Sequence, residues 1–368
     1  MTKQRMKTTA SALLGAMATV ALLWRPEAVT GGVSRGLAIC SGVLIPSLFP
    51  FLALSGFLIR SGAAAAIGRR AGRVTRRLFG LPGCSAAGIL IGFLGGYPSG
   101  ATAVGELVRS GQIDREEARR MLRFCVNGGP GFVIGVVGVG LTGSTAFGAV
   151  LYGCHVLAAL TLGMLGVPPE ARKKKDTGRT AGRGCSLSEA FVESVTGACT
   201  SLTAICAFVL LFSAVLAWVD STGFASAVCG TAQGAKRLTA WIACLLEVSC
   251  GCTAASSLGP LTSLLTSFAV GFGGLSVHCQ VAATLRGTGV MEPSFFLSRL
   301  AQGLLTAVLT VIALRFIPVS LPVGQLMQTP IPKLTSGSVV VSAALLVLCG
   351  VWMLTVGCLD KPRQKPYN

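Results

Sequence analysis

Ten apolar stretches, most of them long enough to cross a bilayer as a helix, dominate this sequence of 368 residues. A membrane-spanning helix needs ~20 apolar residues. Only 12% of the residues are charged, which is about half the share in ordinary soluble domains. The sequence therefore predicts an all-α polytopic membrane protein in which some stretches need not span. The stretches are residues 8–24, 38–59, 86–108, 119–140, 144–167, 198–219, 238–258, 261–286, 294–318 and 339–359.

The positive charge of the chain lies mostly in three short segments between these stretches. The formal net charge is +18, and residues 60–77, 109–123 and 172–183 hold six, five and six of the Lys and Arg residues. Cytoplasmic loops of membrane proteins carry such an excess, so we predict that all three segments are cytoplasmic. This distribution argues against nucleic acid as a partner. Basic residues also precede the stretch 8–24, which we interpret as an uncleaved first helix with a cytoplasmic N-terminus.

The stretch 86–108 is expected to break inside the membrane. If it crossed as one helix, the first two basic segments would lie on opposite sides. Its middle reads Gly95-Gly96-Tyr97-Pro98-Ser99-Gly100, and irregular backbone at membrane depth is tolerated only inside protein or beside a polar cavity. Both arguments favour a re-entrant hairpin or a broken helix. A kinked ordinary helix is the alternative.

The sequence indicates an internal repeat with an offset of 178 residues. At this offset Gly95-Gly96 aligns with Gly273-Gly274, and a connector ending in Asp114 aligns with one ending in Glu292. Each acid is expected near a helix N-terminus, where it stabilises free amides. Repeats with broken helices are typical of secondary transporters, so we predict two inverted repeats. The predicted order is an N-terminal transmembrane helix and loop (1–37), a first repeat (38–167), a basic cytoplasmic linker (168–189), a second repeat (190–318) and a C-terminal transmembrane helix and tail (319–368).

Four breaks of glycine and small polar residues interrupt the apolar stretches. The half-helix N-termini at such breaks present amides that suit an anion, and unwound carbonyls suit a cation or a proton. Unpaired backbone is costly in hydrocarbon, so we expect the four breaks to meet in one polar site near mid-membrane. They are Gly95–Gly100, Asn127–Gly131, Glu247–Thr253 and Gly273–Gln280.

Glu247 is the only acid deep within an apolar stretch. A carboxylate there normally faces a cavity or a partner, so it is predicted to couple an ion or proton, or to contact substrate; a structural hydrogen bond is the alternative. His278 lies between Ser276 and Gln280 beside a double glycine. We expect His278 to share the cavity with Glu247, and Gln280 to point the same way as His278 if the segment is extended.

Three other residue types carry less specific signals. Asn127 precedes Gly-Gly-Pro and is expected either to cap the following half-helix or to contact substrate. His155 lies in a plain helix and is interpreted as a satisfied interior histidine. The 14 cysteines, most of them within apolar runs, are interpreted as small buried residues; the lone pair Cys250 and Cys252 is only weak evidence for a metal.

Enzyme signatures are absent from the sequence. It contains no H-E-x-x-H motif, no P-loop and no dinucleotide-binding glycine fingerprint. No aspartate lies within a predicted spanning stretch, which argues against an intramembrane aspartyl protease. We therefore predict no catalytic residue, metal site or cofactor.

Three motifs along the chain resemble one known family. They are Pro46-Ser47-Leu48-Phe49-Pro50-Phe51, Gly96-Tyr97-Pro98-Ser99-Gly100-Ala101 and Gly273-Gly274-Leu275-Ser276-Val277-His278-Cys279-Gln280. From about residue 38 to 318 the chain resembles the sporulation integral membrane proteins of the YlbJ/SpoVV family. That family carries the nucleoside-recognition, or Gate, domain and is related in fold to concentrative nucleoside transporters. It is implicated in moving dipicolinic acid across the outer forespore membrane.

The resemblance implies a transport site and a substrate. The implied site residues are Gly96, Tyr97, Pro98, Ser99, Gly100, Asn127, Glu247, Ser249, Gly251, Ser276, His278 and Gln280. Dipicolinate is a planar aromatic dianion, for which half-helix amides and the side chains of Ser99, Ser276, His278 and Gln280 offer donors. Tyr97 is expected to stack on the ring or to serve as an interface anchor.

The expected function is therefore transport of a small organic anion, most of all dipicolinate. The expected location is the cell membrane, as a multi-pass protein of the outer forespore membrane. The expected partners are the lipid bilayer, the anion, and a coupling proton or cation. Two alternatives remain open: a transporter of a nucleoside or another solute, and a non-transporting membrane component of spore assembly.

Overall fold

In the computed structural model, every regular element of the described residues is a helix. The structure describes residues 13–317 and 319, except 14, 18, 166, 170 and 172–185. The all-α polytopic class is confirmed, because four helical segments in this part are long and apolar enough to cross a membrane. They are Thr145–Met164, Leu187–Ser221, Gly259–Thr284 and Pro293–Phe316. The predicted helix 339–359 and most of the basic linker lie outside the described residues, as does part of the stretch 8–24.

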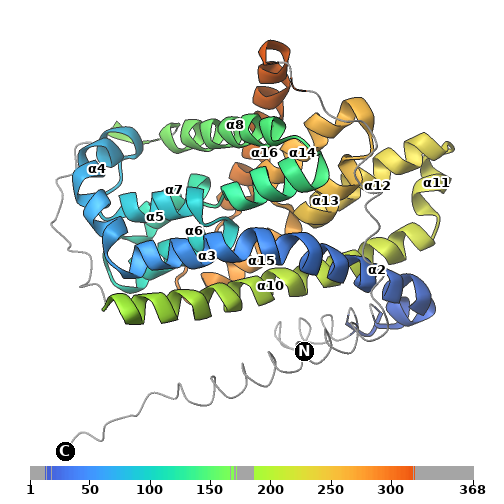
Figure 1. The fold of residues 1–368 in the computed structure, drawn as a ribbon, viewed down its shortest axis with the longest axis horizontal. Coiled ribbons are helices and arrows are strands. Elements are labelled where there is room, and N and C mark those ends of the chain that lie inside the picture. The colour runs from blue at the N-terminus through green and yellow to red at the C-terminus, as the bar shows by residue number, and fades with distance from the viewer. Residues whose placement is uncertain are drawn as a thin grey trace, which may run out of the picture. The chain divides into compact units, whose positions relative to one another are not determined.

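Two long helical rods run side by side and antiparallel (Figure 1). The first comprises α2 (Pro26–Ile39), the π-helical turn η1 (Cys40–Leu44) and α3 (Ile45–Arg60); the second is α10 (Leu187–Ser221). A Cβ added to Gly32 would lie 2.6 Å from the Ser213 carbonyl oxygen, whereas one on Gly56 would lie 3.2 Å from the Ser194 Cβ. Glycine therefore lets the two rods approach closely at both ends.

The basic segments 60–77 and 109–123 are largely helical. Most of the first forms the amphipathic helix α4 (Ala63–Phe79), and most of the second forms α7 (Arg115–Cys125). The Arg120 guanidinium donates to the Gly80 carbonyl oxygen at 3.4 Å, joining the end of α4 to α7. The two segments therefore lie at the same end of the fold, as the topology prediction requires.

The stretch 86–108 is a helical hairpin. It forms α5 (Ser85–Leu94) and α6 (Tyr97–Arg109), which pack on each other. At 1.5 Å per residue the two helices are only ~15 and ~20 Å long, against a hydrocarbon core of ~30 Å. Gly100 is required at their crossing because a Cβ there would lie 3.0 Å from the Gly92 Cα of α5 and would overlap the Cys125 carbonyl oxygen of α7. The predicted break is thus confirmed at Gly95–Gly96.

An interrupted helix and a continuous one complete the first half. Helix α7 ends at Cys125, the backbone is irregular to Pro130, and the π-helical segment η2 (Gly131–Leu141) follows. Helix α8 (Thr145–Met164) packs along η2. Asp114 caps α7 by accepting from the Glu117 N–H at 2.8 Å, which confirms its predicted position.

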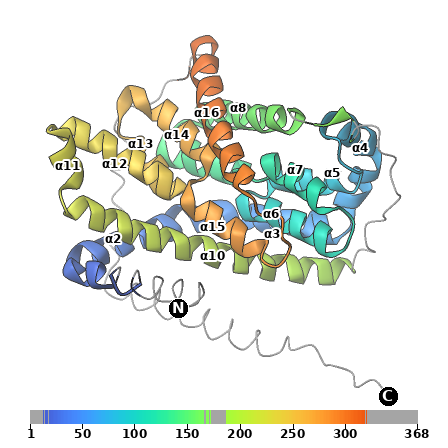
Figure 2. The same ribbon diagram turned by 180° about the vertical axis from the view of Figure 1, so that it is seen from behind.

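The second half has the same order of elements. After α10 come the short helix α11 (Phe224–Cys229) and a hairpin of α12 (Ala232–Leu246) and α13 (Val248–Ala255). The turn η3 (Gly259–Leu261) leads into an interrupted helix, α14 (Thr262–Phe272) with α15 (Gly274–Thr284), and α16 (Pro293–Phe316) ends the unit (Figure 2). Glu292 precedes α16, but its carboxylate pairs with Arg119 at 2.9 Å and makes no cap.

This order corrects the register of the predicted repeat. The offset of 178 residues pairs the hairpin tip at Gly95–Gly96 with Gly273–Gly274, which interrupts a single helix. By element order the hairpin tip instead corresponds to Glu247, and the irregular segment before Pro130 corresponds to Gly273–Gly274. Glycine doublets occur at both kinds of break, so matching them could not distinguish a tip from an interruption. The antiparallel long rods agree with an inverted relationship between the halves.

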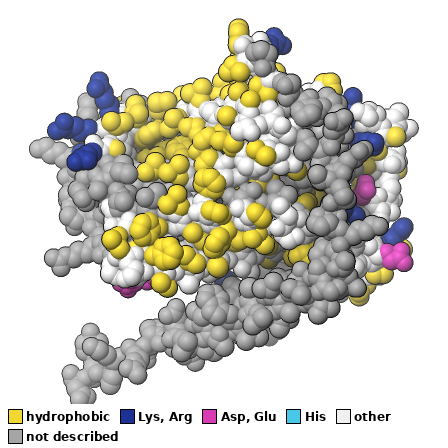
Figure 3. Space-filling model, in the orientation of Figure 1, with side chains coloured by type: hydrophobic (Ala, Val, Ile, Leu, Met, Phe, Trp, Pro, Cys, Tyr) yellow, Lys and Arg dark blue, Asp and Glu magenta, His cyan; other side chains and the backbone are white. Residues whose placement is uncertain are grey.

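The surface agrees with a bilayer environment. Figure 3 shows hydrophobic side chains across the face in view, with Lys and Arg side chains at its margins. Leu157, Leu304 and Val308 are among the large apolar side chains that lie exposed on the long helices. Lipid would cover such side chains.

Candidate functional site

Residues from all four predicted breaks line one cavity. This inner cavity encloses about 550 Å³ of empty space including its open mouth. Most of its lining is apolar, which differs from the polar site that the sequence predicts. The lining residues are Leu44, Leu48, Phe51, Leu52, Leu94, Gly95, Gly96, Tyr97, Gly129, Gly131, Phe132, Ile205, Glu247, Val248, Ser249, Val277 and Gln280.

The breaks touch in pairs within each half. A Cβ on Gly129 would lie 3.0 Å from the Gly96 nitrogen, so the first hairpin tip packs against the first interrupted helix. Likewise, a Cβ on Gly274 would lie 3.0 Å from the Glu247 nitrogen. Gly274 also has a φ of 72°, which other residues rarely adopt. Glycine therefore meets both a conformational and a steric requirement at this point.

A hydrogen bond from the first hairpin tip joins the two halves beside the inner cavity. The Tyr97 hydroxyl donates to the Val270 carbonyl oxygen at 2.6 Å. Val270 lies in the last turn of α14, where carbonyls lack partners within the helix. Tyr97 is buried, with its ring edge-to-face against Phe132 at 6.3 Å between centroids. The structure therefore gives Tyr97 a structural bond, and excludes the predicted role as an interface anchor.

Glu247 both caps a helix and lines the inner cavity. It is 2% exposed, precedes α13, and accepts from the Cys250 N–H at 2.7 Å. Both sequence interpretations of Glu247 are thus compatible with its position. The cap corrects one expectation, however. The N-terminal amides of α13 are occupied by this carboxylate and do not stand open to an anion.

The other predicted site residues of the hairpins, and Gln280 of α15, either line a cavity or pack against neighbouring helices. Ser249 and Gln280 are buried and line the inner cavity, as does Gly96. Ser99 donates to the Gly95 carbonyl oxygen at 3.1 Å and lines a neighbouring cavity instead. Gly251 packs on Cys244, where a Cβ would lie 2.6 Å from the Cys244 Cα. Pro98 lies in the first turn of α6, and Gly100 forms the crossing described above.

His278 does not share the cavity with Glu247. Its Nδ1 lies 2.5 Å from the Gly274 carbonyl oxygen, and its ring stacks on Phe296 at 5.2 Å between centroids. The reason is that residues 274–284 are helical and not extended. Val277 and Gln280, three residues apart, therefore face the cavity together, while His278 points elsewhere. Ser276 is fully buried as well, and it too is absent from the lining.

Asn127 belongs to a buried polar network that does not line the cavity. Its Nδ2 donates to the Phe124 carbonyl oxygen at 2.6 Å, and its Oδ1 accepts from Gln302 at 2.8 Å. Pro130, not Asn127, occupies the cap position of η2, so the predicted cap is wrong. The interior interpretation of His155 is confirmed, since its Nε2 accepts from the Gly128 N–H at 3.1 Å.

Arg299 anchors this network and was missed by sequence reasoning. Its guanidinium is fully buried and donates to the Val126 carbonyl, to the Arg123 carbonyl at 2.8 Å, and to Gln302. A cation at this position stabilises the negative end of the α7 dipole and its unpaired carbonyls. The available signal was an Arg inside the apolar stretch 294–318, a full turn or more from either end.

The described cysteines are all free thiols. No three His, Cys, Asp or Glu side chains in the described part of the chain could hold a metal ion together. Cys250 lies 3.1 Å from the Ser213 hydroxyl, and Cys252 is fully buried. The pair is thus engaged in packing between α13 and its neighbours.

Comparison with known proteins agrees with the motifs. No protein-family model matches the chain, and no solved structure matches it. The chain is 27% identical over 321 residues to the sporulation integral membrane protein YlbJ of Bacillus subtilis (strain 168), which covers 79% of this chain and 78% of the relative. This similarity and the all-helical membrane fold support the resemblance to the YlbJ family of sporulation integral membrane proteins that the motifs indicate.

Proposed function

We propose that the chain is a transporter that moves a small organic anion, dipicolinate above all, across the outer forespore membrane during sporulation. The observation that supports this most is the inner cavity, where the tips of both hairpins meet the interrupted helices. Irregular backbone inside a membrane protein is tolerated where it lines a cavity, and transporters place their solute sites at such points. Sequence similarity to a sporulation integral membrane protein supports a role in sporulation.

The two halves offer a route to alternating access. Each half contributes one hairpin and one interrupted helix to the cavity, and the Tyr97 bond to Val270 links the halves directly. Movement of one half past the other would open the cavity to either side in turn.

The charge of the cavity bears on the coupling ion. Glu247 is the one charged side chain among the described residues that line it. A dianion about 4 Å from an ionised carboxylate would be repelled by about 4 kcal/mol per charge pair at an effective dielectric constant of ~20. We therefore propose that Glu247 is protonated, or pairs with a bound cation, while the anion occupies the cavity. Release of that proton or cation would promote release of the anion.

The same observation favours a second candidate. A cavity lined by one carboxylate, one amide and aromatic rings, with no Lys, Arg or His among its described lining residues, also suits a neutral solute such as a nucleoside. Gln280 and Glu247 would then supply hydrogen bonds to the base or the sugar, and Phe132 would offer a ring for stacking.

Ligand-dependent stability separates these candidates. A solute that binds the folded protein raises its apparent melting temperature with concentration. We expect dipicolinate, and not uridine, to raise the melting temperature of the purified chain in detergent. A shift with uridine alone would favour the nucleoside transporter. No shift with either solute would favour the non-transporting role in spore assembly.

A further inference from the structure

A second, larger cavity, the outer cavity, lies beside the inner one, between the two halves of the fold. It encloses about 1260 Å³ including its open side, and its walls come from α3, α6, α10 and α15. More of its lining residues are polar than in the inner cavity. Arg60 and Glu106 are the charged side chains among the described residues that line it. Its uncharged polar lining residues are Ser99, Thr102, Ser194, Thr200, Ser201, Gln280 and Thr284.

The outer cavity adjoins the inner one and lies at the basic end of the fold. Leu52 and Gln280 line both cavities, so a solute passing between them would contact the Gln280 amide. The Arg109 guanidinium donates a hydrogen bond to the backbone carbonyl oxygen of Thr284, another lining residue, at 2.7 Å. Arg109 belongs to the basic segment 109–123, which together with α4 gives this end a positive field. Such a field concentrates anions at a cavity mouth.

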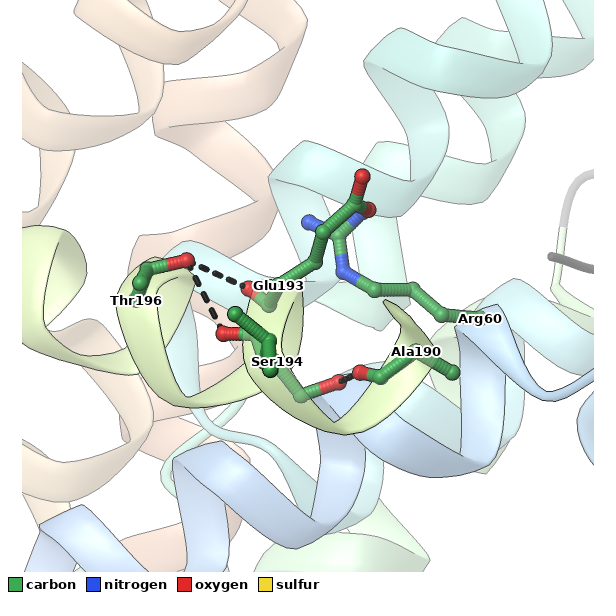
Figure 4. Close-up of polar contacts among 6 residues, drawn as sticks. Arg60, Ala190, Glu193, Ser194 and Thr196 are labelled. Atoms are coloured by element: carbon green, nitrogen blue, oxygen red, sulfur yellow. Dashed lines mark hydrogen bonds and ion pairs between the residues drawn. The ribbon is translucent and has the colours of Figure 1, made fainter. Parts of the chain in front are cut away.

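Arg60 already binds a carboxylate at the wall of the outer cavity. Its Nη1 lies 2.8 Å from Glu193 Oε2, and the two side chains are 36% and 49% exposed (Figure 4). An ion pair this exposed contributes little to stability and exchanges readily. The neighbouring hydroxyls of α10 are turned to their own helix: Ser194 donates to the Ala190 carbonyl and Thr196 to the Val192 carbonyl. Arg60 is therefore the principal charged donor at this wall.

From this arrangement we infer that the outer cavity is the entrance for the anion and that Arg60 is its first binding group. A carboxylate of the solute replaces Glu193 on the Arg60 guanidinium, and Glu193 turns to water. The exchange substitutes one carboxylate for another, so no buried charge is left unpaired. Glu106 repels the bound anion, which keeps binding at the entrance weak and directs the solute toward Gln280. This inference rests on the proposed transport of an anion.

Two substitutions at the ion pair should change uptake in opposite directions. Arg60→Gln removes the binding group, so we expect the KM for dipicolinate uptake into proteoliposomes to rise about tenfold. Glu193→Gln removes the competing carboxylate, so we expect the KM to fall about threefold. Arg315→Gln, an exposed arginine outside the cavity, serves as the matched control. If both ion-pair variants raise the KM, or neither changes it, the pair only holds α3 against α10 and the inference is overturned.

A thiol-labelling measurement tests the entrance without any assumption about the substrate. We expect Ser201→Cys in detergent-solubilised full-length protein to react faster with an anionic methanethiosulfonate than with a cationic one, as read by peptide mass spectrometry. Adding Arg60→Gln should abolish that preference. Thr203→Cys lies on the same helix but not on the cavity lining, and should show no preference dependent on Arg60. No preference at Ser201→Cys would overturn the inference. A clear preference without dipicolinate uptake would instead reject only the proposed substrate.

Discussion

Tyr97 and Val270 are joined by a hydrogen bond of 2.6 Å that links the first hairpin tip to the end of α14. It is a direct polar contact between the two halves at the inner cavity. Tyr97 precedes Pro98 at the start of α6, and Val270 precedes the Gly273–Gly274 break. The bond therefore connects two points close to interruptions of the helical backbone. Its loss should affect both the stability of the protein and its transport activity.

We expect Tyr97→Phe to lower stability by about 1–3 kcal/mol, since the Val270 carbonyl would lose its partner in a buried place. Tyr152→Phe is the matched control, because the Tyr152 hydroxyl donates to the Phe93 carbonyl at 2.9 Å within the first half only. Thermal unfolding in detergent should show a loss for both variants. Dipicolinate uptake should change only for Tyr97→Phe. An equal change in uptake for both variants would show that the Tyr97 bond has no specific role in coupling the halves.

Glu247 should show separable roles in capping and in transport. Glu247→Ala removes the acceptor for the Cys250 N–H and should cost about 1 kcal/mol, as lost N-caps do. Glu247→Gln keeps an acceptor oxygen and removes a buried charge, so its unfolding temperature should match or exceed that of the unmodified chain. Thermal unfolding of the two variants beside Glu27→Gln, an exposed acid at the start of α2, provides the measurement. A large loss in Glu247→Gln would mean that the charge itself holds the hairpin.

His278 should prove to be a packing residue. Because its ring stacks on Phe296 and contacts Phe272 and Phe295, His278→Phe should accumulate and transport normally. His278→Ala should lower the unfolding temperature through a cavity of lost aromatic contacts, by about 3 kcal/mol or more. If His278→Phe is stable but inactive in uptake, the imidazole acts on the solute or on a proton, and its placement outside the site is wrong.

Arg299 should be essential for accumulation. Arg299→Gln would leave the Arg123 and Val126 carbonyls without their cation, and breaking a buried charge network typically costs about 3–5 kcal/mol. We expect little of this variant to accumulate in membranes. Arg315→Gln, on the same helix but exposed, should accumulate normally. Immunoblots of membrane fractions measure the amount of both variants. Normal levels of Arg299→Gln would show that the C-terminal end of α7 is stable without the guanidinium.

Local chemistry was readable from the sequence where one residue type has one physical use. Glycine at Gly95–Gly96 and Gly273–Gly274 predicted broken helices, Asp114 predicted a helix start, and the isolated acid Glu247 predicted a buried group beside a cavity. Each of these features depends on backbone freedom, capping or desolvation, which act over a few residues. The class of fold was equally accessible, because apolar length and low charge decide it.

Features that depend on tertiary contacts were not readable. The direction of His278 follows from α15 being a helix and from the phenylalanines that α14 and α16 bring to it. Arg299 reaches a partner 173 residues away in sequence. Leu48 and Phe51 belong to a motif noted in the sequence, but only the packing of α3 turns them to the cavity. The repeat register failed for the same reason, because only packing separates a hairpin from an interrupted helix.

Uptake of radiolabelled dipicolinate by liposomes containing the purified full-length chain tests the central claim most directly. The claim is that the inner cavity carries the solute and that Glu247 binds the coupling proton or cation. We expect saturable uptake above that of protein-free vesicles, lost in Glu247→Gln and retained in Glu27→Gln at equal protein density. Uptake that Glu247→Gln leaves unchanged, or no uptake of dipicolinate by correctly folded and inserted protein, would contradict the account.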